Sequence, residues 1–277
     1  MFEDELKLYR GRDIKIKDKI VVIQPTLSQI EEFGEREYFN AVHTLTAVGA
    51  DFKWQLWDYD GIDYTTIEDY DLFIKYIYPS LSSRKRVYYE LTNNPEKYKD
   101  ELAKLSKEEL SKMLTNPLSL ILKDLDFADF IPMNLKLAED KSEIVLYNPD
   151  EDLTIDRLAY SQIVDIVRKI HGYKRNNQIP ANERTKMDLI EDARDEAIAN
   201  ANKPYKSILQ SMVSTMKLKC GQCGNDGIWE SKIHAFFYDI KRLLKIQDSE
   251  LLLQGAYSGF ASLKGVDKSR LDIFGDI

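Results

Sequence analysis

The sequence is poor in cysteine, with Cys220 and Cys223 as the only two among 277 residues. Two cysteines cannot build a disulfide scaffold. Long apolar runs are also missing, since no stretch approaches the ~20 residues that a membrane-spanning helix needs. The first six residues are acidic, where a secretory signal would be basic and then apolar. These absences predict a cytoplasmic protein.

Recognisable catalytic motifs are missing as well. The three histidines, His43, His171 and His234, lie in different segments, and there is no Gly-x-Ser-x-Gly nucleophile elbow. The sequence has neither a glycine–lysine phosphate loop nor a Gly-x-Gly-x-x-Gly dinucleotide fingerprint. We therefore expect no enzymatic activity and no cofactor.

The charge balance is acidic, with 39 basic and 47 acidic side chains and a formal net charge of −8. Such a chain repels phosphate backbones unless it carries a local basic face, so general nucleic-acid binding is disfavoured. The apolar content of 43% is that of a folded globular protein. A chain of this length forms one large domain or two modest ones.

The N-terminal part predicts a short β-hairpin followed by a helix. Residues 14–17 alternate between isoleucine and lysine, and residues 20–23 are continuously β-branched. Thr26 and Gln29 have the spacing of a capping box, which predicts a helix over residues 27–47 that Gly34 weakens. A further helix is expected to begin at Thr66 and to end at Pro79.

The middle of the chain predicts two charged helices between residues 84 and 125, with breaks at 93–95 and 116–117. Strand-like apolar patterns on both sides of positions 139–142 predict a second hairpin. Thr154 is expected to cap a helix that ends at Gly172. The rest of the chain predicts three more helices. They are a polar helix after Asn182, a helix over 205–218 and a last helix that begins at Ser231.

These elements predict an α+β fold that is mainly α, with a short N-terminal β-hairpin and a central hairpin among several packed helices. The acidic run at residues 150–152 is the best candidate for a boundary. It would separate an α+β domain, residues 1–150, from a helical domain, residues 151–277. A single domain is the alternative.

The Cys220-Gly-Gln-Cys223 sequence is half of a zinc motif. Two thiolates at this spacing can hold one ion, and His234 and Asp226 could complete four ligands. The alternatives are a redox pair, for which the expected context of a strand and a helix N-terminus is absent, and a flexible glycine loop with two reduced thiols. The loop without metal is favoured, and a small zinc- or thiol-dependent binding module centred on Cys220 and Cys223 remains the second hypothesis.

The densest aromatic stretch includes Trp54, Trp57, Tyr59 and Tyr64 and is interleaved with aspartates. The acids from Asp58 onward fail the register of an EF-hand calcium loop, because the glycine falls at position 4 instead of 6. The four aromatics are therefore candidates either for the core or for a partner-binding surface, where Trp and Tyr are enriched.

A compact basic cluster spans residues 168–175, at the predicted end of a helix. Cations are favoured at that position by the helix dipole. The alternative is a binding site for an acidic partner.

Three sequence blocks resemble proteins of a known kind. They are Gln24-Pro-Thr-Leu-Ser-Gln-Ile-Glu-Glu-Phe-Gly-Glu, Trp57-Asp-Tyr-Asp-Gly-Ile-Asp-Tyr with Asp69-Tyr-Asp-Leu-Phe, and Lys241-Arg-Leu-Leu-Lys-Ile-Gln with Leu253-Gln-Gly-Ala-Tyr-Ser-Gly. Together they resemble uncharacterised proteins encoded in the structural-gene region of tailed phages and prophages of Gram-positive bacteria. This family has no known site residues, and the two-cysteine loop does not match it.

The resemblance implies a role in virion morphogenesis, either as a tail-assembly chaperone or as a minor tail or baseplate component. The implied partners are phage structural proteins of the tail tube, tape measure or baseplate, and a homo-oligomer is left open. The implied location is the host cytoplasm during assembly, and the virion for a tail component.

Overall fold

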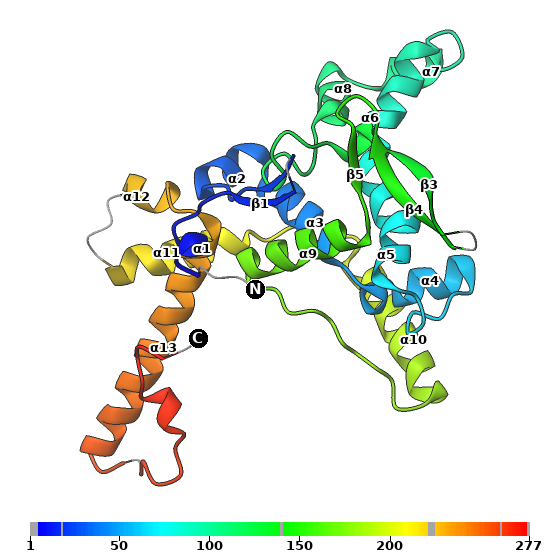
Figure 1. Ribbon diagram of the computed structural model, residues 1–277. Helices are drawn as coiled ribbons and strands as arrows, with labels where there is room; N and C mark the ends of the chain where they lie inside the picture. Colours follow the sequence, from blue (N-terminus) through cyan, green and yellow to red (C-terminus); the bar gives the residue numbers. More distant parts are fainter. Residues whose placement is uncertain (1–4, 18, 139–140, 221–224, 261, 276–277) are drawn as a thin grey trace.

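The computed structural model describes residues 5–17, 19–138, 141–220, 225–260 and 262–275 (Figure 1). The fold is mainly α with some β, as predicted, and it contains both predicted hairpins. The elements up to residue 114 are α1 (Glu5–Tyr9), β1 (Ile14–Lys17), β2 (Ile20–Val22), α2 (Leu27–Phe33), α3 (Glu35–Thr46), η1 (Gly49–Asp51), α4 (Lys53–Asp60), α5 (Asp69–Leu72), η2 (Phe73–Ile77), α6 (Tyr78–Asn93), α7 (Lys99–Lys104) and α8 (Lys107–Leu114).

The second half of the chain adds a three-stranded sheet and the longest helices. Its elements are η3 (Phe127–Asp129), β3 (Ile131–Ala138), β4 (Lys141–Asn148), β5 (Leu153–Ile155), α9 (Arg157–His171), α10 (Glu183–Asn200), α11 (Ile208–Cys220), α12 (Asn225–Trp229), α13 (Ile233–Tyr257) and η4 (Lys268–Arg270).

The N-terminal region contains the predicted hairpin and the predicted capping box. Strands β1 and β2 pair antiparallel, and Thr26 and Gln29 exchange both hydrogen bonds of the box at 3.2 and 2.8 Å. The prediction of one helix over 27–47 was wrong. The chain divides into α2 and α3 at Gly34, whose φ of 106° lies in a region that residues with a side chain rarely adopt.

Helices α5 and α6 form one continuous helical segment, in contrast to the prediction that a helix begins at Thr66 and ends at Pro79. The first helical residue is Asp69, and Pro79 lies in the first turn of α6. The π-helical turn η2 immediately precedes it, and the Tyr78 N–H donates to the Phe73 carbonyl five residues back. The wider π turn shifts the hydrogen-bonding pattern just before the proline, which has no N–H of its own to donate.

The central sheet has the order β3–β4–β5, and all of its pairings are antiparallel. Thr154 was predicted to cap a helix, but it pairs with Tyr147 as part of β5. The cap of α9 is Asp156, whose carboxylate accepts the Ala159 N–H at 2.8 Å. The position of the cap was missed because Leu153, Thr154 and Ile155 are β-branched or apolar and gain a strand partner from β4.

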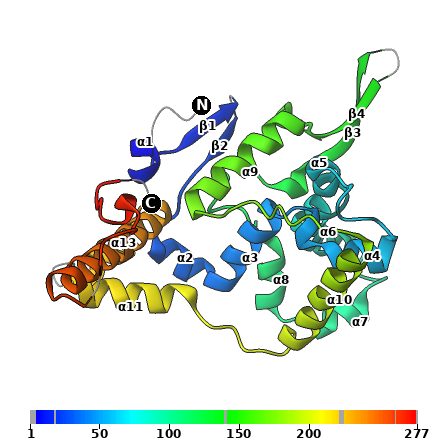
Figure 2. The ribbon, with the colours of Figure 1, turned by 90° about the horizontal axis from the view of Figure 1, so that it is seen from below.

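Helix α9 lies at the centre of the molecule (Figure 2). Eight of its fifteen residues are buried, and it contacts α3, α5, α13 and strands of both sheets. The buried core is one cluster that extends from Leu8 to Phe236, and it includes residues from both sides of the predicted boundary at 150–152. That boundary lies in the turn between the paired strands β4 and β5.

Helix α13 leaves the body and projects from it in Figure 1. It begins at Ile233, two residues after the predicted Ser231, and continues to Tyr257, well beyond the apolar pattern that ended at Leu244. The chain after it folds back along the helix. Arg242 donates to the carbonyls of Ile273 and Gly275, and Arg270 forms a bidentate ion pair with Asp248 at 3.0 and 2.7 Å. We call α13 and the described residues after it, 258–260 and 262–275, the arm.

Candidate functional site

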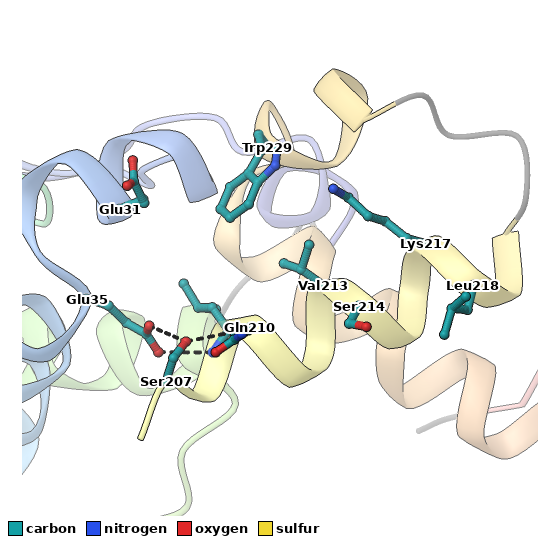
Figure 3. A pocket seen from close by; sticks show the side chains of 10 residues that line it. Glu31, Glu35, Ser207, Gln210, Val213, Ser214, Lys217, Leu218 and Trp229 are labelled. Carbon is teal, nitrogen blue, oxygen red and sulfur yellow. Dashed lines mark hydrogen bonds between the residues drawn. The ribbon is translucent and has the colours of Figure 1, made fainter. Parts of the chain in front are cut away.

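An open cavity of about 510 Å³ with a mainly apolar lining lies between α2, α11 and the end of α12, and we call it the groove (Figure 3). Its volume lies within the range of roughly 300–1,000 Å³ that is usual for binding sites. The apolar lining comes mainly from Leu209 and Val213 on α11 and from Trp229. A second cavity, of about 450 Å³, adjoins the groove and shares Glu31 and Trp229 with it.

Glu35 fixes the position of α11, which forms one wall of the groove. Its carboxylate accepts the Ser207 hydroxyl at 2.6 Å and the N–H groups of Ile208 and Leu209 at 2.7 and 3.0 Å. Partial burial by itself raises the pKa of Glu35, but the bonds from Ser207 and the two N–H groups outweigh it and lower the pKa. A carboxylate from α3 therefore caps the N-terminus of α11, where the helix dipole favours negative charge.

The opposite wall is held by backbone bonds to the start of α2. The Leu27 N–H donates to the Ser231 carbonyl at 3.2 Å, and the Ile233 N–H donates to the Pro25 carbonyl at 3.1 Å. These bonds place Trp229 beside α2, with its indole partly buried against the core. Lys217 lies over the indole, 5.9 Å from the ring centroid. The two walls are thus positioned independently of any ligand.

Two acids form the rim where the groove meets the adjoining cavity: Glu31 lines both, and Glu230 lines the adjoining cavity. Glu31 and Glu230 are exposed, and neither carboxylate has an ion pair or hydrogen bond to any residue that the structure describes. Lys217 is the positively charged residue of the lining. Leu218, at the far end of the groove, is 84% exposed. An apolar floor with unpaired acids beside it suits an apolar ligand that carries positive charge.

The aromatic candidates do not form one surface. Tyr64 is 3% exposed and belongs to the core, whereas Tyr59 is 73% exposed. Trp54 and Trp57 are partly buried against the core. A partner could therefore contact Tyr59 and the accessible edges of the two indoles, but not Tyr64 in this conformation.

The aspartates of the same segment are engaged with other elements. Asp58 forms a bidentate pair with Arg194 of α10 at 2.7 and 2.6 Å. Asp63 accepts from Lys186 of α10 at 2.7 Å, and Asp60 accepts the Tyr76 hydroxyl at 2.6 Å. Asp58 and Asp63 therefore attach α10 to α4 and to the loop that follows α4, whereas Asp60 bonds to Tyr76 of η2.

The two-cysteine loop begins at the C-terminal end of α11. Cys220 is the last residue of α11, and Cys223 lies outside the described residues. The third candidate ligand, His234, donates from Nδ1 to the Ile170 carbonyl at 3.1 Å. Within the described part of the chain no group of three potential ligands is placed to hold a metal ion.

The three histidines converge near the C-terminal end of α9, which the sequence did not predict. His171 is buried, and its Nδ1 faces the Val167 carbonyl at 2.7 Å. That nitrogen must carry the proton, so Nε2 accepts the Tyr38 hydroxyl at 2.6 Å. Burial lowers the pKa of His171 to about 4 and also lowers the pKa values of His43 and His234. The cluster is neutral at pH 7, which is typical of a structural role.

The basic cluster at residues 168–175 is engaged mainly with its own chain. Arg168 donates to the Thr46 carbonyl at 2.5 Å, and Arg175 forms an ion pair with Asp69 at 2.9 Å. Both line a cavity of about 620 Å³ that also contains Glu68 and Asp165. Acids and arginines alternate around this cavity, so it does not present the uniform positive surface that a phosphate backbone requires.

Comparison with known proteins found no relative of this chain. No protein-family model matches the chain, and neither a curated protein nor a solved structure matches it. Among the described helices, none is both long and apolar enough to cross a membrane.

The groove itself was not predicted from the sequence. Its components are separated by almost 200 residues, from Glu31 to Trp229. The one signal of the groove in the sequence was Trp229, which lies between two predicted helices and has no apolar periodicity around it. Tryptophan is enriched at interfaces, because one end of its ring system is apolar and the other is polar.

Proposed function

We propose that this protein is a non-enzymatic phage morphogenesis protein that acts through protein–protein contacts, and that the groove is the contact surface. The observation that carries the proposal is the groove's combination of an apolar floor, a partly buried tryptophan and two rim carboxylates that have no partner among the described residues. The biological setting comes from the resemblance of the three sequence blocks to proteins from tail-structural gene regions.

The chemistry of the groove favours a protein segment as its ligand. Apolar grooves bounded by helices receive apolar side chains from a partner, and a Trp at the wall is a frequent hot spot of such contacts. Glu31 and Glu230 would pair with lysine or arginine beside those apolar side chains. The ligand class is therefore a segment with exposed apolar residues followed by positive charge.

The test is association with tail particles in cells that produce the source phage. Ser214 lines the groove and is exposed, so Ser214→Arg would fill the groove without removing a buried side chain. Thr215 is the next residue on α11, is also exposed and does not line the groove, so Thr215→Arg is the matched control. We expect the wild type and the control to sediment with tails or tail intermediates and Ser214→Arg to remain in the soluble fraction.

Mass spectrometry of the same fractions separates the two versions of the role. A minor tail or baseplate protein would be present in purified mature particles at a symmetric copy number. A tail-assembly chaperone would be bound to tail proteins in the lysate and absent from particles. Absence from both fractions, or equal behaviour of the two arginine variants, would refute the proposal.

A further inference from the structure

The end of the arm carries the kind of segment that the groove would receive. Tyr257 and Phe260 are 88% and 94% exposed, which makes them the most exposed aromatic rings of α13 and the turn that follows it. Lys264, four residues further on, is also exposed and has no ion-pair partner among the residues described. We call Tyr257, Phe260 and Lys264 the tip.

The backbone holds the tip in a defined geometry. The Phe260 N–H donates to the Gly255 carbonyl at 3.0 Å, and the Gly259 N–H donates to the Ala256 carbonyl at 3.1 Å. With Gly259 at φ 77°, these two bonds form the Schellman motif that ends a helix. The residue in the position of Phe260 usually packs back onto the helix, but the residue that it would meet here is Gly255, which offers no side chain. The ring therefore points into solvent.

The tip cannot fill the groove of its own chain. Helix α13 starts four residues after Trp229 and has 25 residues, which corresponds to a length of about 37 Å at 1.5 Å per residue. Figure 1 shows the helix running away from α11 and α12. The return segment is fixed along the helix by the ion pair of Arg270 with Asp248 and by the Arg242 bonds. The arm thus carries the tip away from the groove.

We propose that the tip of one copy of this chain docks into the groove of a second copy. This inference rests on the proposed function, because it names the partner of the same groove. Phe260 and Tyr257 would enter between Val213 and Trp229, and Lys264 would lie at the acidic rim. The apolar surfaces match, and Lys264 meets the carboxylates of Glu31 and Glu230, all three of which lack an ion-pair partner in the described part of the chain.

The contact is head-to-tail, since groove and tip are different surfaces of one molecule. Such a heterologous interface generates a ring if the rotation between copies closes, and an open chain if it does not. Two aromatic side chains bury roughly 300–500 Å² on one side, less than the ~800 Å² per partner of a stable complex. Association of the isolated protein is therefore expected to be weak and dependent on concentration.

The experiment is sedimentation velocity of the purified full chain over a hundredfold range of concentration. The wild type is expected to form oligomers as the concentration rises. The tip variant Tyr257→Ser/Phe260→Ser and the groove variant Ser214→Arg are expected to associate at least about tenfold more weakly, as for hot-spot residues. The matched controls are Phe274→Ser, whose ring is 88% exposed elsewhere on the arm, and Thr215→Arg. Circular dichroism checks that each variant is folded.

Mixing the two defective variants gives the decisive result. The tip variant retains its groove and the groove variant retains its tip, so an equimolar mixture should form a dimer and nothing larger. A wild type that stays monomeric throughout, variants that associate like the controls, or a mixture without dimer would each overturn the inference. If the purified protein is monomeric while Ser214→Arg still abolishes association with tail particles, the inference falls and the proposed function stands.

Discussion

The buried His171 predicts a specific loss of stability in acid. Its Nδ1–H donates to the Val167 carbonyl and its Nε2 accepts the Tyr38 hydroxyl, so the folded protein holds the ring neutral. Burial lowers the pKa of His171 from 6.5 to about 4. At pH values between these two, the unfolded chain binds a proton that the folded chain does not bind. The stability contributed by the neutral ring is therefore complete above pH 6.5 and falls as the pH drops towards 4.

The size of the effect follows from the pKa difference. One pH unit corresponds to about 1.4 kcal/mol for one proton, so the fall from 6.5 to about 4 lowers the free energy of unfolding by about 3 kcal/mol. That is a large fraction of the roughly 5–15 kcal/mol by which a domain is usually stable.

The assay is urea unfolding followed by tryptophan fluorescence at several pH values between 7.5 and 4. Carboxylates also titrate in this range, so the quantity of interest is the difference between wild type and His171→Gln. We expect this difference to shrink by about 3 kcal/mol on acidification, because glutamine does not titrate. His43→Gln is the control, since His43 is more exposed than the fully buried His171 and should change the slope less.

A second variant separates titration from packing. Tyr38→Phe removes the hydroxyl that Nε2 of His171 accepts, which should lower stability at pH 7.5 by about 1–3 kcal/mol. Its pH dependence should stay close to that of the wild type, because His171 is still present. A constant difference between wild type and His171→Gln from pH 7.5 to 4 would refute a neutral, buried His171.

Four further substitutions and one metal analysis test other parts of the structure. Glu35→Ala removes the cap of α11 and should cost about 0.5–2 kcal/mol above pH 4.5; because the folded pKa of Glu35 is lowered, the deficit should shrink as the pH falls below 4.5. Gly49→Ala would place a methyl group 2.4 Å from the Tyr64 carbonyl oxygen, so its urea midpoint should be clearly lower than that of the wild type. Trp57→Ala should lose roughly half of the 3–5 kcal/mol typical of a fully buried tryptophan, whereas Tyr59→Ala should change stability by less than about 0.5 kcal/mol; equal losses would contradict the observed burial. Protein purified without chelator should contain well below about one zinc per chain, and a full equivalent would favour the two-cysteine module.

Local sequence patterns determined most of the secondary structure. The Thr26–Gln29 capping box depends on residues within one turn of each other, and it formed as predicted. The two predicted hairpins formed as well, since alternation and turn residues specify a strand pair without reference to the rest of the fold. The charged helices end after Asn93 and before Asn116 because asparagine and proline at these positions interrupt a helix locally.

Tertiary contacts decided the features that local patterns left ambiguous. Pro79 lies inside a helical segment because a π turn precedes it, and Thr154 became a strand residue because β4 lies alongside. His171 is neutral because the folded core buries it, and its Nε2 accepts the hydroxyl of Tyr38, 133 residues away. The groove joins α2 to α11 and α12, and Glu35 from α3 caps the first turn of α11 across 172 residues of sequence. Such pairings depend on long-range packing of the chain, which the periodicity of a single segment does not encode.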